Sequence, residues 1–347
     1  MNGNALAATG LVCSLAAASL AADFPRAEIS NGTIHAVLYL PDAQRGYYRG
    51  TRFDWSGVFA SLEYQGHNYY GPWFQRMDPK VHDFVYDGPD IVAGLASAIS
   101  GPVEEFSSGG STLGYDQAKP GDTFVKIGVG ALRKPNEPRY DHYEAYEVVD
   151  PGKWNVRNGP DWVEFTQELN GPAGYAYVYR KTIRLVKDKS AMTLQHSLKN
   201  TGRRKIEADV YNHNFLVLDG QPTGPDFEIY FPFQVRSAKP PNEELAEIRG
   251  KQIVYLKTLV NKDTVAAGIQ GFGDSSQDYD FSIENRKQGA GMRVTADRPL
   301  LRAALWSIRS VIAVEPYLGM SIEPGGEFTW AQTYNFYTIG SVSVPRK

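Results

Sequence analysis

Residues 191–200 alternate apolar and polar side chains, and this pattern constrains the fold more than any other feature of the sequence. Successive side chains of a β-strand point to opposite faces, so a period of two gives this segment one apolar face. That face comprises Met192, Leu194, His196 and Leu198. A strand with one buried face is typical of an antiparallel sheet, and His196 is expected to be a core histidine with satisfied nitrogens.

Strand-like segments fill most of the chain. Residues 161–169, 175–186, 191–200 and 206–218 are expected to form a continuous antiparallel meander. About fifteen such segments occur in total, without the strand–helix alternation of a parallel sheet and without an obvious repeat. The sequence therefore predicts an all-β fold, a large antiparallel β-sandwich, in a single domain over residues 23–347.

Few segments are predicted to be helical. Residues 242–249 are the best candidate, because Asn242 can cap a helix, glutamates occupy its first turn and Gly250 follows its end. Residues 91–99 are expected to form a second, short helix. The weakly patterned stretch 71–119 is interpreted as loops over one end of the fold, since long irregular segments in compact domains often form a functional rim.

The N-terminus has the composition of an export signal. Residues 5–22 are apolar, mostly Ala and Leu, and end in small residues that suit signal peptidase, although no basic residue precedes Arg26. A membrane anchor is the alternative, but an Ala-dominated run is a weak spanning segment. Residues 1–22 are therefore predicted to be a signal peptide, and the protein to be periplasmic or extracellular. Cleavage would remove Cys13, the one cysteine, and with it any disulfide or thiolate chemistry.

Several function classes are disfavoured by the sequence. A net charge of −3 gives no indication of nucleic acid or an acidic membrane surface as a partner. The sequences Gly128-Val129-Gly130 and Gly271-Phe272-Gly273 lack the third glycine of a dinucleotide site, and no phosphate loop or Gly-x-Ser-x-Gly elbow occurs. The six histidines are scattered, without a metal-site spacing. Neither a metal nor a cofactor is expected.

Residues 209–220 suggest a binding function. In a strand, His213 would share a face with Tyr211 and Phe215, whereas Asn212 would point to the other face. An imidazole between two aromatic rings could hold a sugar, with the rings against its C–H face and the imidazole against its hydroxyls. A histidine packed among aromatic residues is the plainer alternative.

A carboxylate near the C-terminus is the second candidate. Glu315 ends the very apolar run at residues 311–314, where it would be either buried and hydrogen-bonded or used in chemistry. Desolvation would raise the pKa of Glu315 and suit it to proton transfer.

Short motifs over residues 160–338 resemble the aldose 1-epimerases, the galactose mutarotase-like proteins, in their order along the chain. They are Asn200-Thr201-Gly202, Tyr211-Asn212-His213-Asn214-Phe215, Val314-Glu315, Glu323-Pro324-Gly325-Gly326-Glu327-Phe328 and Thr333-Tyr334-Asn335-Phe336. The resemblance implies a β-supersandwich fold and interconversion of sugar anomers without a cofactor.

The same resemblance implies roles for individual residues. His213 resembles the general acid of that family and Glu315 its general base. Asp278, in Asp278-Tyr279-Asp280-Phe281, resembles the aspartate that binds sugar hydroxyls. Further sugar contacts are expected from Tyr211, Asn212 and Phe215.

The first half of the chain departs from the family pattern. A Leu-His-Gly-Gly segment is replaced by residues 124–130, which contain no histidine, so either Lys126 or His142 is expected to take its place. A Gly-Arg-x-x-Asn-Arg motif is also missing, and Arg52 and Arg76 are candidate substitutes. We therefore expect a small sugar or sugar derivative as substrate, different from free galactose or glucose.

Three functions remain open on the sequence alone. The first is an exported sugar epimerase that depends on His213 and Glu315. The second is a carbohydrate-binding protein that keeps the cleft without the catalysis. The third is a lyase or hydrolase, because related sandwiches host several chemistries, although hydrolysis normally needs two carboxylates and Glu315 has only Asp278 as a weak second.

Overall fold

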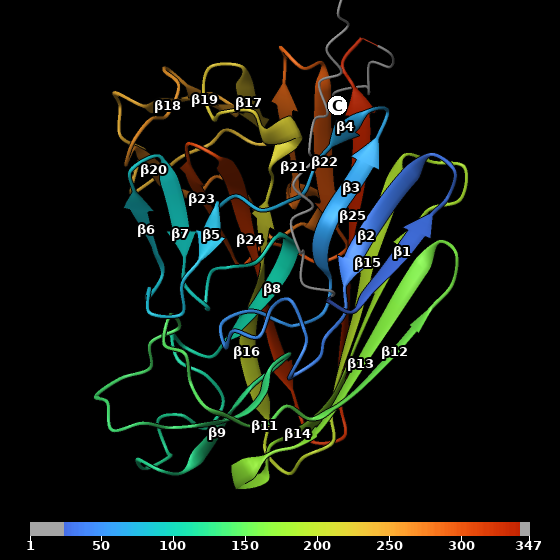
Figure 1. Cartoon of the computed structure of the whole chain (residues 1–347), viewed down its shortest axis with the longest axis vertical. Coiled ribbons are helices and arrows are strands. Elements are labelled where there is room, and N and C mark those ends of the chain that lie inside the picture. The colour runs from blue at the N-terminus through green and yellow to red at the C-terminus, as the bar shows by residue number, and fades with distance from the viewer. Residues whose placement is uncertain (1–23, 341–347) are drawn as a thin grey trace, which may run out of the picture.

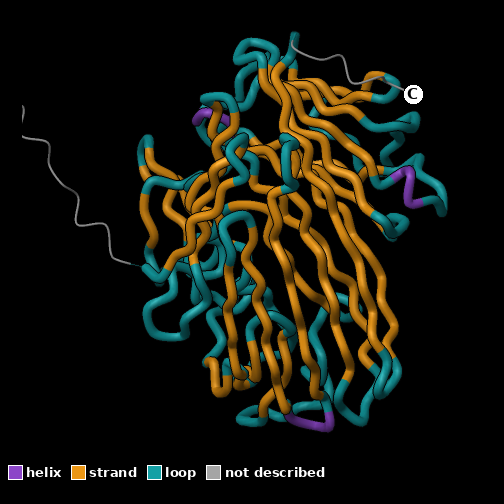
Figure 2. Tube along the Cα trace, turned by 90° about the vertical axis from the view of Figure 1, so that its right-hand side faces the viewer, coloured by secondary structure: helices purple, strands orange, loops and turns teal. Residues whose placement is uncertain are grey.

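The computed structural model describes residues 24–340, and nearly all of its regular structure is β-strand (Figures 1 and 2). The all-β prediction is confirmed. The helices of this part are single 3₁₀ turns, η1 (Pro172–Gly174), η2 (Leu218–Gly220) and η3 (Ser276–Asp278). No helix between residues 24 and 340 is long and apolar enough to cross a membrane. The predicted signal peptide lies outside the described residues and stays a prediction.

A ten-stranded antiparallel sheet forms one layer of the sandwich. Its strands, in spatial order, are β12 (Lys153–Asn158), β13 (Trp162–Asn170), β14 (Ala176–Leu185), β15 (Ala191–Asn200), β25 (Glu327–Thr338), β22 (Ala290–Ala296), β21 (Asp280–Asn285), β17 (Phe227–Tyr230), β19 (Gln252–Tyr255) and β18 (Ala246–Arg249). In β15 the predicted apolar face is buried and the alternate residues are more exposed. This sheet therefore presents one continuous apolar surface to a second layer.

A five-stranded antiparallel sheet forms the second layer. Its strands, in spatial order, are β20 (Thr264–Ile269), β23 (Arg302–Ile308), β24 (Val311–Ile322), β16 (Ile206–Phe215) and β8 (Gly101–Ser107). Every residue of β8 except its last is buried, so both faces of this sheet are covered at that edge. The side chains on the outer face of this sheet build the candidate site.

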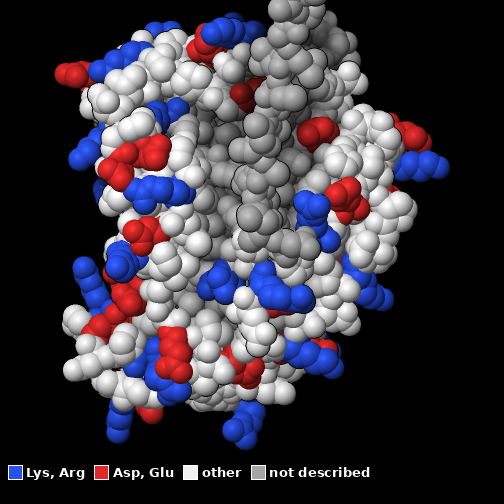
Figure 3. Space-filling model, in the orientation of Figure 1, with Lys and Arg blue, Asp and Glu red and all other residues white. Residues whose placement is uncertain are grey.

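Three smaller sheets complete the fold. The first contains β1 (Arg26–Ser30), β2 (Ile34–Tyr39), β3 (Val58–Tyr64) and β4 (His67–Asn68); the second contains β9 (Thr123–Lys126), β10 (Gly130–Arg133) and β11 (Val148–Asp150); the third contains β5 (Arg76–Met77), β6 (Phe84–Asp87) and β7 (Asp90–Ala93). The pair β5–β7 is parallel, and the other pairs of these sheets are antiparallel. On the face shown in Figure 3, Lys and Arg are interspersed with Asp and Glu.

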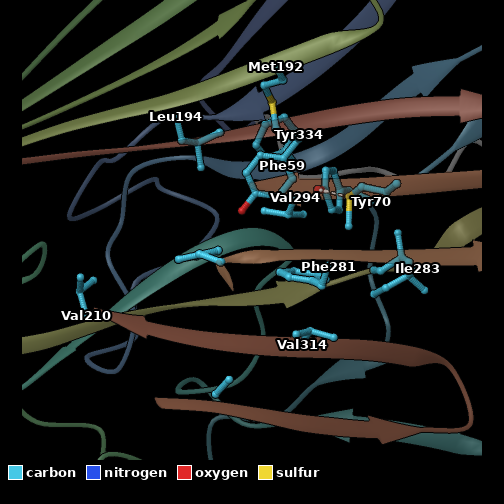
Figure 4. Packing of buried hydrophobic residues seen from close by; sticks show 14 of the residues in the cluster. Phe59, Tyr70, Met192, Leu194, Val210, Phe281, Ile283, Val294, Val314 and Tyr334 are labelled. Carbon is cyan, nitrogen blue, oxygen red and sulfur yellow. Dashed lines mark hydrogen bonds between the residues drawn. The ribbon is translucent and has the colours of Figure 1, made fainter. Parts of the chain in front are cut away.

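Apolar side chains from both layers meet in the interior (Figure 4). Met192 and Leu194 of β15 and Tyr334 of β25 come from the large sheet, and Val210 and Val314 come from the five-stranded sheet. All five are at most 1% exposed. Removal of this apolar surface from water is the main force that holds the two layers together.

Polar groups also cross the interior, and each has a partner from the facing sheet. Gln332 of β25 donates to Asn212 Oδ1 at 2.9 Å. Tyr334 of the same strand donates to Asn214 Oδ1 at 2.8 Å. His196 is buried as predicted, with its Nε2 2.8 Å from a carboxylate oxygen of Glu104. The prediction that both of its nitrogens are satisfied is wrong, because Nδ1 has no hydrogen-bond partner within residues 24–340. These bonds fix which face of β16 points inward.

Two sequence predictions about β-structure require correction. Residues 206–218 do not continue the meander, because β16 leaves the large sheet and pairs with β24 and β8 in the other layer. The stretch 71–119 is not all loop, because it contains β5, β6, β7 and the buried strand β8. Alternation identifies a strand, but it does not say which sheet the strand joins.

The two predicted helices are also wrong. Asn242 does accept a hydrogen bond from the backbone N–H of Glu244, but the turn ends there and Ala246–Arg249 pairs as β18 with β19. Gly250, at a φ of 62°, closes this hairpin instead of ending a helix. Residues 91–99 contain the end of β7 and a turn. A helical segment of eight or nine residues gains little by itself, and strand pairing outweighs it.

Candidate active site

A cavity of about 470 Å³ lies on the outer face of the five-stranded sheet. Strands β16, β24, β23 and β20 form its floor, and the segment around β6 and the loop before β11 contribute to its walls. The lining residues central to its chemistry are Arg52, His142, Tyr211, His213, Phe215 and Glu315. Six of the ten candidate site residues singled out from the sequence therefore line one cavity.

The alternation of β16 separates the site from the core. Tyr211, His213 and Phe215 line the cavity. Asn212 and Asn214 point the opposite way, into the interior between the layers, where both are hydrogen-bonded. Asn212 was expected to contact the sugar. It does not line the cavity, because a period of two places it on the inner face.

His213 and Glu315 lie on adjacent strands and face each other. Tyr211 pairs with Tyr317, and Leu216 pairs with Ile312 in the same register, so His213 lies opposite Glu315. Their closest atoms, His213 Nε2 and Glu315 Oε1, are 3.3 Å apart, and the side chains are 6% and 12% exposed. An imidazole and a carboxyl group thus face each other at the floor of the cavity, with little exposure to solvent.

Aromatic packing orients the imidazole of His213. Its ring stacks on Phe215, with centroids 3.7 Å apart and planes 9° apart. The ring of Phe53 packs edge-on at 5.7 Å, and Trp306 lies at 5.5 Å on another side. Within residues 24–340, His213 Nδ1 is buried without a hydrogen-bond partner. The imidazole is therefore held in place by its ring contacts and not by a hydrogen bond at Nδ1.

The environment shifts the pKa values of this pair in opposite directions. Burial lowers the pKa of His213 well below its usual 6.5, and the Arg52 charge lowers it further. Burial raises the pKa of Glu315 to about 7, against the opposing influence of Arg52. Near neutral pH the imidazole is therefore uncharged, and when the pair holds a proton, that proton is on the carboxyl group.

A second buried carboxylate anchors the wall beside the pair. Glu105 of β8 accepts hydrogen bonds from Arg52 Nε at 2.8 Å and from the Tyr211 hydroxyl at 2.7 Å. Lys126 Nζ lies 3.2 Å and His142 Nδ1 3.4 Å from its other oxygen. Burial alone would raise the pKa of Glu105, but Lys126 and Arg52 hold it well below its usual range. Glu105 is therefore ionised and fixes Arg52 and Tyr211 in the cavity.

The structure separates the two candidates for the missing histidine position. His142 reaches the cavity from the loop between β10 and β11. Lys126 does not line it, because its fully buried ammonium donates to Glu105 and to the Phe106 carbonyl at 2.8 Å. Of the two arginines, Arg52 lines the cavity, whereas Arg76 forms an exposed ion pair with Asp87.

Asp278 is not brought into the cavity. It lies in η3, where its carboxylate accepts a hydrogen bond from the backbone N–H of Gly273 at 2.6 Å. The carboxylate caps its own loop, as short polar side chains in turns commonly do. The role expected for Asp278 as a hydroxyl ligand is therefore not supported by its position.

Several cavity residues were not found from the sequence. They are Trp73, Asp83, Tyr143, Lys239, Trp306 and Tyr317, together with Glu105 behind the wall. Glu105 carried a usable signal, since two adjacent glutamates interrupt the apolar run Val103–Phe106 in the same way that Glu315 ends one. The aromatic residues carried none, because core and cavity aromatics look alike in a sequence. Within residues 24–340 no group of three His, Cys, Asp or Glu side chains could hold a metal ion.

Solved structures with the same architecture are similar to this chain over nearly its whole length. A protein of Synechocystis sp. PCC 6803 matches with a TM-score of 0.53 and 11% identity, over 92% of this chain and 98% of its own. The aldose epimerase homologue of C. elegans matches at 0.51 and 16%, over 91% and 99%. A candidate aldose 1-epimerase of Escherichia coli matches at 0.50 and 12%, over 90% and 99%.

Sequence comparison alone does not find these relationships. No protein-family model and no curated protein matches the chain. At these identities the structural matches establish the fold: the chain has the galactose mutarotase-like β-sandwich of the aldose 1-epimerases. The fold-level expectation drawn from the sequence is confirmed.

Proposed function

We propose that this chain is a carbohydrate epimerase that interconverts the anomers of a sugar by general acid–base catalysis at His213 and Glu315. One observation carries the proposal: the two side chains face each other at 3.3 Å on the floor of a 470 Å³ cavity. An acid and a base that are already in contact and shielded from water suit proton transfer. Ring-opening of a pyranose requires such a pair.

His213 and Glu315 together would accept and supply every proton that the reaction transfers. One group takes the proton of the anomeric hydroxyl while the other protonates the ring oxygen, so that the C1–O bond of the ring breaks and an aldehyde forms. Rotation about the C1–C2 bond exposes the other aldehyde face, and ring closure returns both protons. Positioned groups of this kind accelerate such steps by roughly 10²–10⁴-fold. No net proton is gained or lost.

The pKa shifts of His213 and Glu315 suggest a different position for the proton in the free protein. The family resemblance implies His213 as the acid and Glu315 as the base, but the neutral imidazole and the raised pKa of Glu315 place the proton on the carboxyl group of the free enzyme. Glu315 would then protonate the ring oxygen while His213 accepts the anomeric proton. Both assignments need one proton on the pair, so they are kinetically equivalent.

The cavity wall supplies groups that suit a sugar. Phe215, Trp306 and Tyr317 line the cavity with aromatic surface against which the C–H side of a ring could pack. Arg52, held by Glu105, and Tyr211 offer polar edges for hydroxyl groups. These contacts would position the anomeric centre over the dyad.

A non-catalytic carbohydrate-binding protein is the second candidate. The observation that favours it is the departure from the family motifs, since neither a histidine at residues 124–130 nor the double-arginine motif is present. An aromatic cavity without those groups could still bind a sugar. In an epimerase, Glu315 and His213 are needed for the rate of anomer exchange. In a binding protein they contribute only to the shape of the cavity.

Polarimetry on freshly dissolved α-anomers separates the two candidates. The protein would be added to a panel of neutral hexoses, pentoses, uronic acids and sugar phosphates, and optical rotation followed to equilibrium. Relaxation faster than in buffer for at least one sugar is the result expected. Saturable binding of a sugar, measured by calorimetry, with no faster relaxation for any member would favour the binding protein.

A further inference from the structure

The floor of the cavity continues past the dyad as a trough without side-chain bulk. On β23, Ala304 lies opposite Glu315, and on β20, Gly268 lies opposite Ala304. A Cβ atom built on Gly268 would meet no atom within 4 Å, so open space lies above this residue. We call this strip above Ala304 and Gly268 the trough.

Larger side chains border the trough on both sides. Trp306, two residues along β23 from Ala304, forms one wall next to the imidazole of His213. Tyr317, two residues along β24 from Glu315, forms the other wall, where its ring stacks on Tyr211 with centroids 4.4 Å apart. A sugar ring with its anomeric carbon at the dyad can therefore extend along the trough.

Lys239 lies at the far end of the trough. The backbone N–H of Gly268 donates to the carbonyl of Lys239 at 3.2 Å, which places this lysine beside β20, and Lys239 is one of the residues that line the cavity. Within residues 24–340 no acidic group lies within ion-pairing distance of its ammonium. Other cations near the cavity are already paired: Arg52 and Lys126 with Glu105, and Arg302, whose guanidinium lies 3.9 Å from the centre of the Tyr317 ring, with Asp209 at 3.1 Å.

We propose that the trough is a subsite for the anionic end of an acidic sugar, with Lys239 binding a carboxylate or phosphate at the end of the sugar opposite its anomeric carbon. The proposal rests on the proposed function, because the anomeric centre is placed at His213 and Glu315. Two strand spacings, roughly 10 Å, separate β24 from β20. A hexose that bears an acidic group at its sixth carbon can span this length.

Charge elsewhere in the cavity is consistent with this direction. Asp83, the other carboxylate of the lining, accepts a hydrogen bond from Ser97 Oγ and acts electrostatically on Tyr143. Tyr143 in turn lies under the Arg52 guanidinium, at 4.8 Å. Asp83 therefore belongs to the Arg52 wall and leaves Lys239 as the free cation at the trough end.

The first test measures substrate preference. kcat/KM for anomer exchange is compared for a neutral hexose, the matching uronate and the matching 6-phosphate, in the native protein and in Lys239→Gln. A hydrogen-bonded charge pair is worth about tenfold to a hundredfold in affinity, so the native protein should prefer an acidic sugar by such a factor. Lys239→Gln should collapse that ratio and Lys239→Arg should retain most of it.

The matched control is Lys257→Gln, since Lys257 is exposed and does not line the cavity. Its acidic-to-neutral ratio should equal that of the native protein. A preference for the uronate alone assigns the trough to a carboxylate, and a preference for the 6-phosphate alone assigns it to a phosphate. Equal kcat/KM for neutral and acidic sugars, unchanged in Lys239→Gln, would overturn the proposal.

A second variant tests the trough independently of charge. Gly268→Leu fills the open space above β20, and Gly268 has no left-handed φ that a side chain would strain. The KM of the preferred acidic hexose should rise at least tenfold, and more than that of a pentose, which lacks the sixth carbon. An unchanged KM for the acidic hexose would show that the substrate does not enter the trough.

Failure of the proposed epimerase function and failure of the trough subsite give different results. If no sugar shows faster anomer exchange, the proposed epimerase function is wrong, and the inference is then decided by binding alone. Calorimetric Kd values for the uronate and the 6-phosphate should rise about tenfold or more in Lys239→Gln. Unchanged Kd values, or no binding of either acid, would overturn the inference even where a neutral sugar is epimerised.

Discussion

In the proposed reaction His213 and Glu315 share one proton, and this sharing sets its pH dependence. The singly protonated pair is lost as pH rises through the pKa of Glu315, about 7. On the acid side a second proton binds only at His213, whose pKa is depressed. kcat/KM should therefore be level below about pH 6.5 and fall tenfold per pH unit above 7.5.

A stopped-assay profile from pH 5 to 9 measures this dependence. In Glu315→Gln the residual activity should lose the downward limb, because the titrating group is gone. A native profile that rises with pH through 7 would contradict the account, since it would require the ionised carboxylate with no proton on the pair.

The buried carboxyl group of Glu315 also costs stability at alkaline pH. Its folded pKa of about 7 exceeds its unfolded value, so the folded state binds more protons between about pH 4.5 and 7, and stability falls as pH rises through that window. The difference corresponds to about 3 kcal/mol above pH 7. Glu315→Gln should therefore be more resistant to urea than the native protein at pH 8.5, and not at pH 5.

Urea denaturation of both proteins at the two pH values measures this effect. Most core substitutions lower the free energy of unfolding, whereas Glu315→Gln is expected to raise it at pH 8.5, and this makes the prediction specific. A loss of stability in Glu315→Gln that is equal at pH 5 and pH 8.5 would show that the carboxyl group is not desolvated in the folded protein.

How far single residues can be predicted depends on what their neighbours in the chain reveal. His213 was singled out because Tyr211 and Phe215 share its face of the strand, and Glu315 because it ends an apolar run. Asn212 was misplaced even though the period of two already assigned it to the other face. Asp278 matched a motif locally, yet its carboxylate caps a loop that the sequence alone cannot place in space.

Strand β8 connects the cavity to the interior through two adjacent carboxylates. Glu105 faces the cavity wall, whereas Glu104 faces the interior, where Lys181, His196 and Asn212 bind its carboxylate. Burial would raise the pKa of Glu104, but the charges of Lys181 and His196 lower it to about 2. An ionised carboxylate in the core therefore depends on its partners.

Removal of one partner of this buried pair should be strongly destabilising. Lys181→Met leaves Glu104 charged without its ammonium and should cost about 3–5 kcal/mol of unfolding free energy. The double variant Lys181→Met/Glu104→Gln should cost less than the sum of the two single variants, because it removes both charges. Urea denaturation of the four proteins gives this coupling, and strict additivity would contradict the pairing.

At the element scale, prediction succeeded where a strand carries its own pattern. The strands β13, β14 and β15 were located to within a residue or so from alternation alone. The fully buried β8 was missed, because it has no exposed face and therefore no alternation. β18 was mistaken for a helix, because a capping residue and glutamates describe a local preference that pairing with β19 overrides.

The molecule as a whole combines a rigid sandwich with a less regular cavity wall. The loop at residues 134–147 contributes His142 and Tyr143, and the segment around β6 contributes Asp83. One contact between them is His82 Nε2 to Asp141 Oδ2 at 3.0 Å, between exposed side chains. Exposed ion pairs of this kind contribute little, so these walls should open far more readily than the sheets.

Hydrogen exchange followed by mass spectrometry tests this difference. Peptides from residues 134–147 and 78–88 should exchange orders of magnitude faster than those of β15 and β16, and a bound sugar should slow them. The sheet strands should exchange together, at the free energy of global unfolding. Uniform protection of walls and sheets, unaffected by sugar, would contradict a wall that closes over the ligand.

The two-layer architecture was predictable because about fifteen strand segments without helices leave few alternatives. The position of β16 in the five-stranded sheet was not predictable, because nothing in its pattern distinguishes one sheet from the other. The cavity depends on that position, because β16 brings His213 beside Glu315 only in the five-stranded sheet. Individual residues of the site could therefore be proposed from the sequence, but their arrangement in space could not.

The central claim, proton transfer by His213 and Glu315, is tested most directly by exchange spectroscopy of sugar anomers at equilibrium. Proton NMR cross-peaks between the α and β anomeric signals would be measured for the most responsive sugar with native protein, His213→Gln and Glu315→Gln. The control is His35→Gln, an exposed histidine of β2. The account predicts enhanced exchange in the native and control proteins, reduced by roughly 10²-fold or more in each site variant. Enhanced exchange that survives in both folded site variants would contradict it.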